Sequence, residues 1–283
     1  MPNRNSIIKH GDKMPDDLSA LFIGERNSGK TTLLYKYIFN LEQLTLYDKK
    51  GNKRILKTDP SQKTSDFKLD FNNLMIYAKE QNQFIYQLIK QGIENKIKFS
   101  SMDEILEVFL KKKYVDIEEE EDDDDEDDET FIEKLCMAFA KNYPESVDNK
   151  SNITFFMSDN INDFNINKLD KRKKNLIIFD DCENSKDQSI IFDFFQVGRH
   201  KNCSPIYLAH EFYGNLSTLR SRVSQFILFN TSKDKLSRIF NSINLPVDKK
   251  EFYDIARNTW ANSREKKYLF FNKESNELLI SPF

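Results

Sequence analysis

The chain has 283 residues, of which 39% are hydrophobic and 31% charged, with 24 Phe and 11 Tyr. This length suits one large α/β domain or two small ones, and the aromatic content is enough to bury a core, which argues against wholesale disorder. The three cysteines have no CxxC spacing, which disfavours a disulfide scaffold or a zinc ribbon and indicates an intracellular, reducing setting. No apolar run approaches the roughly 18 residues that a membrane-spanning helix needs, and residues 1–13 have no apolar signal-peptide core.

The formal net charge of −3 conceals an uneven distribution of charge along the chain. Residues 118–129 are twelve consecutive acids, and without them 34 acidic side chains stand against 43 basic ones, a balance of +9. An acidic tract of this kind cannot pack into a core, so we expect 115–130 to be a disordered insertion within a single domain that spans 1–283. The basic body is compatible with a polyanionic partner, and equally with lysines scattered over the surface.

Short apolar runs and stretches of helical spacing alternate along the chain. In the first part, the pattern predicts strands at 18–24, 74–78 and 153–157 and helices at 31–44, 83–91, 102–114 and 131–142, whereas 48–65 is polar and turn-rich. In the second part, it predicts strands at 175–180, 205–209 and 225–230, helices at 189–197, 235–241 and 249–261, and a terminal hairpin from 267–271 and 277–280. This alternation predicts an α/β fold with a mainly parallel central sheet, flanked by helices on both faces, and a C-terminal β-hairpin.

Residues 24–31 read Gly-Glu-Arg-Asn-Ser-Gly-Lys-Thr and match the phosphate-loop motif GxxxxGK[ST]. In this motif the glycines let backbone N–H groups surround the phosphates, the lysine reaches the β- and γ-phosphates, and the threonine hydroxyl binds Mg²⁺. The chain has only 7 glycines, and the motif lies between a predicted strand and a predicted helix, so the signal is specific. We therefore expect a P-loop NTPase that binds nucleotide through Gly24, Glu25, Arg26, Asn27, Ser28, Gly29, Lys30, Thr31 and Thr32, with Thr31 also a metal ligand.

The strand predicted at 175–180 ends in two carboxylates, which is the Walker B pattern. Asp180 is expected to hold Mg²⁺ through water or in its second shell, and Asp181 to orient or deprotonate the attacking water. Two acids at a strand end can also simply begin a turn, but the phosphate loop upstream favours the functional interpretation.

Further candidates lie beyond the Walker B strand. His210 comes directly after the strand at 205–209, where ATPases of this architecture place a polar sensor of the γ-phosphate, so it is the candidate sensor. A lone histidine is more often a structural residue, and that alternative stays open. Arg199, Arg220 and Arg222 are candidates to stabilise the charge on the transferred phosphoryl group, in a neighbouring subunit, with Arg220 the first choice and Arg199 the second. Surface ion pairing is the alternative for each arginine.

The residues after the metal-binding strand narrow the choice of nucleotide. A GTPase would carry DxxG there and NKxD later, whereas this chain reads Asp-Asp-Cys-Glu at 180–183. The later string that comes nearest to NKxD, Asn-Thr-Ser-Lys-Asp at 230–234, has the wrong spacing between its residues. ATP is therefore the expected nucleotide.

Several strings resemble the vaccinia-type genome-packaging ATPases. These ATPases belong to the FtsK–HerA superfamily and occur in large nucleocytoplasmic DNA viruses and virophages. They are Asn-Leu-Ile-Ile-Phe-Asp-Asp at 175–181, Phe-Gln-Val-Gly-Arg-His-Lys-Asn at 195–202, Pro-Ile-Tyr-Leu-Ala-His at 205–210, Leu-Arg at 219–220 and Phe-Ile-Leu-Phe at 226–229. Residues 75–79 together with Tyr86 are similar to the second strand and helix of that family, so the resemblance covers most of 18–271 outside the acidic tract. The chain differs from the family at His210, where Gln is usual, and at Arg222, where Asn is common.

The resemblance implies a RecA/FtsK-like ATPase that hydrolyses ATP with Mg²⁺ in a homo-oligomeric ring and moves double-stranded DNA into a preformed capsid. It further implies capsid or portal-vertex proteins as partners, and the host cytoplasm (the virus factory) or the virion as the location. Two other interpretations stay open from the residues alone. One is an ATP-binding switch or scaffold with slow turnover, and the other is a P-loop kinase that acts on a small molecule.

Overall fold

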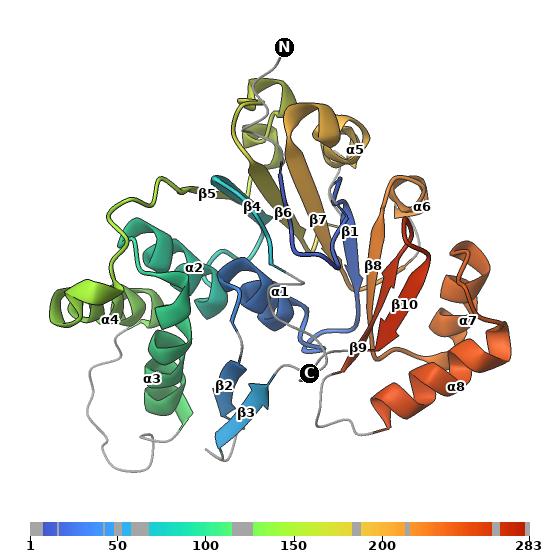
Figure 1. The fold of residues 1–283 in the computed structure, drawn as a ribbon, viewed down its shortest axis with the longest axis horizontal. Helices are drawn as coiled ribbons and strands as arrows, with labels where there is room; N and C mark the ends of the chain where they lie inside the picture. The colour runs from blue at the N-terminus through green and yellow to red at the C-terminus, as the bar shows by residue number, and fades with distance from the viewer. Residues whose placement is uncertain are drawn as a thin grey trace.

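The computed structural model describes residues 8–15, 17–41, 43–47, 53–57, 68–114, 127–182, 188–212, 216–261 and 267–280. Across these ranges, no helix combines the length and the apolar character that crossing a bilayer would require. The described residues form a sheet with helices on both sides (Figure 1).

Eight strands of the described chain form one mixed, mostly parallel sheet (Figure 1). Its order is β10 (Glu277–Ile280), β9 (Tyr268–Asn272), β8 (Gln225–Phe229), β1 (Ala20–Ile23), β7 (Cys203–Ala209), β6 (Asn175–Asp180), β4 (Asn73–Ala78) and β5 (Thr154–Ser158). The strands from β8 to β5 run parallel, whereas β9 is antiparallel to both β8 and β10, so the predicted terminal hairpin is confirmed. Because β7 lies between β1 and β6, the segments that leave the carboxyl ends of these three strands are neighbours.

Helices cover both faces of this sheet. One core holds side chains of α1 (Lys30–Phe39), α2 (Phe84–Glu94), α3 (Met102–Tyr114) and α4 (Asp128–Asn142), and the other those of α5 (Gln188–Val197), α6 (Leu216–Arg220), α7 (Lys233–Ser242) and α8 (Lys249–Trp260). Short 3₁₀ helices lie between these elements: η3 (Phe99–Ser101), η5 (Pro144–Ser146), η6 (Ile161–Asp163), η7 (Ile166–Lys168) and η8 (Gly198–Lys201). The three-layer α/β architecture expected from the sequence is therefore confirmed.

Successive side chains of a β-strand point to opposite faces of the sheet, so each strand contributes side chains to both cores. On β1, Phe22 belongs to the first core, whereas Leu21 and Ile23 belong to the second. On β6, Ile178 and Phe179 divide in the same way, and all six residues of that strand are buried. A strand covered on both faces reads as a continuous apolar run, which is why these strands stand out in the sequence.

The region after α1 differs from the expectation. The helix predicted to reach residue 44 ends at Phe39, because Asn40 adopts a left-handed conformation (φ 52°) and donates its backbone N–H to the carbonyl of Lys36. The chain then forms β2 (Gln43–Tyr47), which pairs antiparallel with β3 (Lys53–Lys57) in a separate two-stranded sheet. The prediction of helix is therefore wrong at 40–41 and 43–44, and the described part of the region predicted as turn-rich is a strand, 53–57.

The acidic tract lies mostly outside the described residues, which leave out 115–126. Helix α4 begins at Asp128, three residues before the predicted start. Asp127 is its N-cap and accepts a hydrogen bond from the backbone N–H of Thr130 at 2.8 Å. The last acids of the tract therefore belong to the helix terminus, where negative charge is favourable.

Candidate nucleotide-binding and catalytic site

The phosphate loop joins the carboxyl end of β1 to α1 and is held against the neighbouring strands. The backbone N–H of Gly24 donates to the carbonyl of Ala209 at 3.1 Å, which ties the start of the loop to the end of β7. A Cβ atom on Gly24 would lie 2.6 Å from the Cβ of Phe229 and 2.6 Å from the Oγ of Ser28. Gly29 has φ 102°, a conformation that L side chains rarely adopt. Packing therefore requires the first motif glycine, and backbone geometry requires the second.

Lys30 is the first residue of α1, and its side chain points back into the loop. The residue is 6% exposed, and its Nζ donates to the carbonyl oxygens of Gly24 at 2.6 Å and Glu25 at 3.1 Å. The same Nζ lies 3.3 Å from Nδ1 of His210. A buried ammonium group needs such partners, and phosphate oxygens would replace them directly.

Asp180 ends β6 as a buried carboxylate next to the loop. Its Oδ2 accepts a hydrogen bond of 2.6 Å from the hydroxyl of Tyr86, a fully buried residue of α2 that itself accepts one from the side chain of Thr31. Burial raises the pKa of the Asp180 carboxyl, while the Tyr86 hydrogen bond and the charge of Lys30 act in the opposite direction. Thr31, Tyr86 and Asp180 thus form a continuous chain between the two Walker motifs.

Asp181 and His210 meet beside Lys30. Asp181 has φ 51°, which is uncommon for a residue other than glycine, and its Oδ1 lies 4.0 Å from Nε2 of His210. The imidazole of His210 therefore lies between the lysine of the phosphate loop and the second acid of the Walker B pair. The sheet order produces this arrangement, because β7 carries His210 between β1 and β6.

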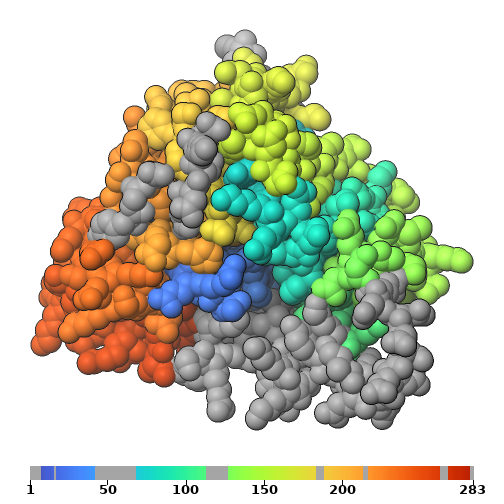
Figure 2. Space-filling view, turned by 180° about the vertical axis from the view of Figure 1, so that it is seen from behind, coloured from blue at the N-terminus to red at the C-terminus, as the bar shows by residue number. Residues whose placement is uncertain are grey.

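The remaining loop residues lie around this centre. Arg26 is exposed, and its Nη2 is 3.7 Å from Oε1 of Glu80, which follows β4. Asn27 has φ 62°, and the Oγ of Ser28 is buried with no hydrogen-bond partner in the described chain. Thr32 is half-buried on the first turn of α1. On the rear face, the blue N-terminal part of the chain reaches the surface between the cyan and orange segments (Figure 2).

Two contributors to this site were not assigned a role from the sequence. Tyr86 was noted only as part of the family resemblance. Lys235 of α7 belongs to no motif, yet its Nζ lies 2.8 Å from Oε1 of Glu211 and 3.7 Å from Oε1 of Glu25. These two glutamates raise the pKa of Lys235, and the lysine links the loop to the segment after β7. No motif marks either residue, because each comes from an element whose approach is fixed only by the tertiary fold.

Arg220 lies at the carboxyl end of α6 and contacts its own chain. Its Nη1 donates to the carbonyl of Phe212 at 3.3 Å, and its guanidinium carbon lies 4.6 Å from the centre of the Phe212 ring. Because Phe212 follows His210 by two residues, Arg220 is packed beside the candidate sensor segment.

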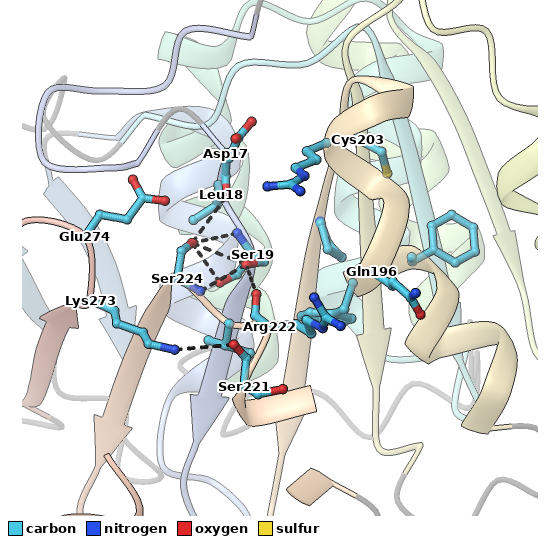
Figure 3. Close-up of a pocket in the computed structure, with 15 residues that line it drawn as sticks. Asp17, Leu18, Ser19, Gln196, Cys203, Ser221, Arg222, Ser224, Lys273 and Glu274 are labelled. Carbon is cyan, nitrogen blue, oxygen red and sulfur yellow. Dashed lines mark hydrogen bonds between the residues drawn. The ribbon is translucent and has the colours of Figure 1, made fainter. Parts of the chain in front are cut away.

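Arg199 lies at the opposite edge of the sheet. It belongs to η8 and lines a cavity of about 420 Å³ at the amino ends of β1, β7 and β8 (Figure 3). The polar and charged lining residues are Asp17, Ser19, Gln196, Arg199, Ser221, Arg222, Ser224, Lys273 and Glu274. Lys30 and Asp181 lie at the carboxyl ends of the strands, so Arg199 and Arg222 do not meet the phosphate loop of their own chain.

The residues present fit a nucleotide with its metal ion. The unpartnered Oγ of Ser28 and the loop-bound ammonium of Lys30 are donors suited to phosphate oxygens. The Thr31 hydroxyl and the Asp180 carboxylate are oxygen ligands of the kind that Mg²⁺ takes. The fold and this site together define a P-loop NTPase.

Residues 143–275, from the end of α4 to the turn after β9, match the family described as Poxvirus A32 protein. This segment carries Asp180, Asp181, Arg199, His210 and Arg220, whereas the phosphate loop lies outside it and is identified by its own motif. The matched segment is less than half of the chain, and within it the match agrees with the resemblance to the vaccinia-type packaging ATPases. Together with the phosphate loop, it gives the chain the motifs of a nucleotide-binding ATPase.

Solved structures that match the chain include the genome packaging NTPase B204 from Sulfolobus turreted icosahedral virus 2. Its complex with sulfate has 15% identity and a TM-score of 0.42, with 94% of this chain and 96% of that chain covered. Its complex with ATP-gammaS has 13% identity and a TM-score of 0.40, with 95% and 98% covered. The DNA-packaging ATPase B204 from Sulfolobus Turreted Icosahedral Virus has 13% identity and a TM-score of 0.41, with 94% and 97% covered. No curated protein matches the chain.

Proposed function

We propose that this ATPase hydrolyses ATP with Mg²⁺ and uses the energy to move double-stranded DNA through a ring of identical subunits into a viral capsid. The observation that carries the proposal is the convergence of Lys30, Asp181 and His210, with contacts of 3.3 Å and 4.0 Å that join Walker A, the sensor strand and Walker B. A bare phosphate-binding turn would not need the second acid or the histidine.

Each side chain has a role that derives from its position. Lys30 exchanges the carbonyls of Gly24 and Glu25 for phosphate oxygens of the nucleotide. Thr31 and Asp180 would hold Mg²⁺, which would neutralise negative charge on the nucleotide phosphates. Asp181 orients the attacking water and accepts its proton.

His210 is suited to report the state of the γ-phosphate, because it lies between the phosphate-binding lysine and Asp181. A residue in this position changes its contacts when the γ-phosphate leaves. The neighbouring segment carries Arg220, so a change at His210 can pass to α6.

Capsid or portal-vertex proteins are the further partners of such a motor, and the virus factory or the virion is its location.

In the proposed ring, an arginine of one subunit acts at the nucleotide site of the next subunit. Arg199 and Arg222 lie at the edge of the sheet away from their own phosphate loop. In a closed ring, such an edge can face the nucleotide of the next subunit, and a guanidinium there can stabilise the transferred phosphoryl group. Arg220 is the alternative candidate for the same role.

Steady-state ATP hydrolysis with and without double-stranded DNA tests the proposal. We expect marked stimulation by DNA, and a loss of about 100-fold or more in the Lys30→Ala and Asp181→Asn variants. Arg257→Gln, which alters an exposed residue of α8, is the matched control and should keep full activity. Turnover that ignores DNA would contradict a translocase and favour a small-molecule kinase. Tight binding of ATP without turnover would favour a switch.

A further inference from the structure

The hydroxyl group of Tyr86 lies between the two Walker motifs, although neither motif includes a tyrosine. The residue lies in the first turn of α2 and is fully buried, and its hydroxyl touches the side chains of both Thr31 and Asp180. Other buried tyrosines bond away from the site: Tyr35 donates to the carbonyl of Met102, and Tyr37 pairs with Tyr268. Tyr86 alone among these contacts both residues that the proposed function assigns to the metal ion.

The hydrogen bond to Asp180 constrains the carboxylate. A buried carboxylate with one oxygen bound at 2.6 Å has a fixed orientation, and its other oxygen, Oδ1, is left for another partner. Groups that hydrogen-bond a metal ligand without touching the metal commonly set its affinity. The donor here comes from α2, so the position of that helix on the sheet becomes part of the metal site.

We propose that Tyr86 is a positioning residue that orients the Asp180 carboxylate for Mg²⁺ through this hydrogen bond, and thereby sets the affinity of the ATPase for the metal–nucleotide complex. The inference rests on the proposed function, because it takes Thr31 and Asp180 as the metal-binding pair. It gives α2 a defined task in a site otherwise built from the carboxyl ends of β1, β6 and β7.

The test is a metal titration that does not depend on turnover. Binding of a fluorescent, non-hydrolysable ATP analogue to the full chain is followed while Mg²⁺, or Mn²⁺ in a parallel series, is added. For Tyr86→Phe we expect about 10-fold or more metal at half-saturation, with the metal-free affinity for the analogue unchanged. Tyr35→Phe is the matched control, because it removes a buried hydroxyl that bonds only to backbone, and its metal midpoint should equal that of the wild type.

The titration distinguishes failure of the proposed metal site from failure of the role inferred for Tyr86. If the wild type binds the analogue without any response to metal, both the proposed metal site and the inference fail. If the wild type responds to metal and Tyr86→Phe has the same midpoint, the inference alone is overturned.

A second pair of variants covers the case in which an unpaired Asp180 destabilises the fold of Tyr86→Phe. Asp180→Asn is compared with the double variant Asp180→Asn/Tyr86→Phe in the same titration. We expect the two midpoints to agree within about twofold, because Tyr86 acts through Asp180. A further weakening of about 10-fold in the double variant would show that Tyr86 acts elsewhere, and would overturn the inference.

Discussion

At the scale of the residue, the two adjacent carboxylates of the Walker B pair have different environments. Asp180 is buried and hydrogen-bonded to Tyr86, whereas Asp181 is partly exposed and faces His210. The backbone turns between them, because Asp181 adopts φ 51°. This left-handed conformation points the second carboxylate away from the strand, at a cost of about 1 kcal/mol for a side chain with a Cβ.

The backbone at Asp181 predicts an unusual order of stabilities. Asp181→Gly should be more stable than Asp181→Ala by about 1 kcal/mol in the free energy of unfolding, because only glycine adopts this φ without strain. Both variants should lose hydrolysis. Urea denaturation measures the difference, and Asp193, inside helix α5, provides the matched control with the opposite order. Equal stabilities of the two variants at 181 would contradict the left-handed backbone.

His10 predicts a dependence of stability on pH. Its Nδ1 accepts the backbone N–H of Asp70 at 3.0 Å and its Nε2 pairs with Ser204 at 2.9 Å, so the buried ring is neutral. Burial lowers the pKa of His10 from 6.5 to about 4. Between these values the unfolded chain binds a proton that the native chain does not, so stability falls as the pH falls from about 6.5 to about 4, by roughly 3 kcal/mol at most.

Chemical denaturation of the wild type and His10→Gln across this pH range measures that contribution. The wild type should lose more stability on acidification than the variant, while His200→Gln, at an exposed position of η8, should follow the wild type. Parallel curves for wild type and His10→Gln would rule out the neutral, buried ring.

Much of the candidate site can be read from the sequence because its key residues lie in contiguous motifs. Lys30 and Thr31 follow a strand-to-loop transition, and Asp180 and Asp181 end an apolar run. Tyr86 and Lys235 could not be assigned in this way, since each reaches the site from a helix far away in the chain. Contacts of this kind depend on the order of the strands, which the local pattern does not specify.

At the scale of the element, the junction of β1, the phosphate loop and β8 has no spare space. Gly24→Ala should destabilise the fold by roughly 1–3 kcal/mol and weaken nucleotide binding, because the added methyl group would lie 2.6 Å from the Cβ of Phe229. Denaturation and nucleotide titration measure the two effects. A variant with wild-type stability and affinity would contradict the close approach of the loop to β8.

Elements with a clear physical signal were predicted to within a few residues. The parallel strands are short apolar runs because both of their faces are covered, and α3 was predicted with the bounds it has in the structure. Strands β2 and β3 were missed, because the leucines at 41 and 44 continue the helical spacing of α1 and β3 is flanked by polar residues. Asn40 was the available signal for the end of α1, since asparagine tolerates the left-handed cap that stops a helix.

At the scale of the whole molecule, the nucleotide site and the arginine-lined cavity lie at opposite ends of the sheet's strands. A single chain therefore does not bring Arg199 to its own phosphate loop. If this edge faces the next subunit of a ring, each active site combines residues of two chains.

Mixing two inactive variants tests that division. Lys30→Ala lacks a phosphate-binding lysine but keeps Arg199, whereas Arg199→Ala keeps the loop and lacks the arginine. Mixed assemblies should recover part of the ATPase activity, because some interfaces then contain both groups. The same mixture with Arg220→Ala distinguishes the two candidates, and recovery with Arg220→Ala but not with Arg199→Ala would transfer the role to Arg220.

Displacement of a triplex-forming strand from double-stranded DNA is the most direct test of translocation. A protein that moves along the duplex removes the third strand when ATP and Mg²⁺ are present. We expect ATP-dependent displacement by the wild type and none by Lys30→Ala or Asp181→Asn. ATP hydrolysis stimulated by DNA without any displacement would contradict a translocating motor, and would leave an ATPase that binds DNA without moving along it.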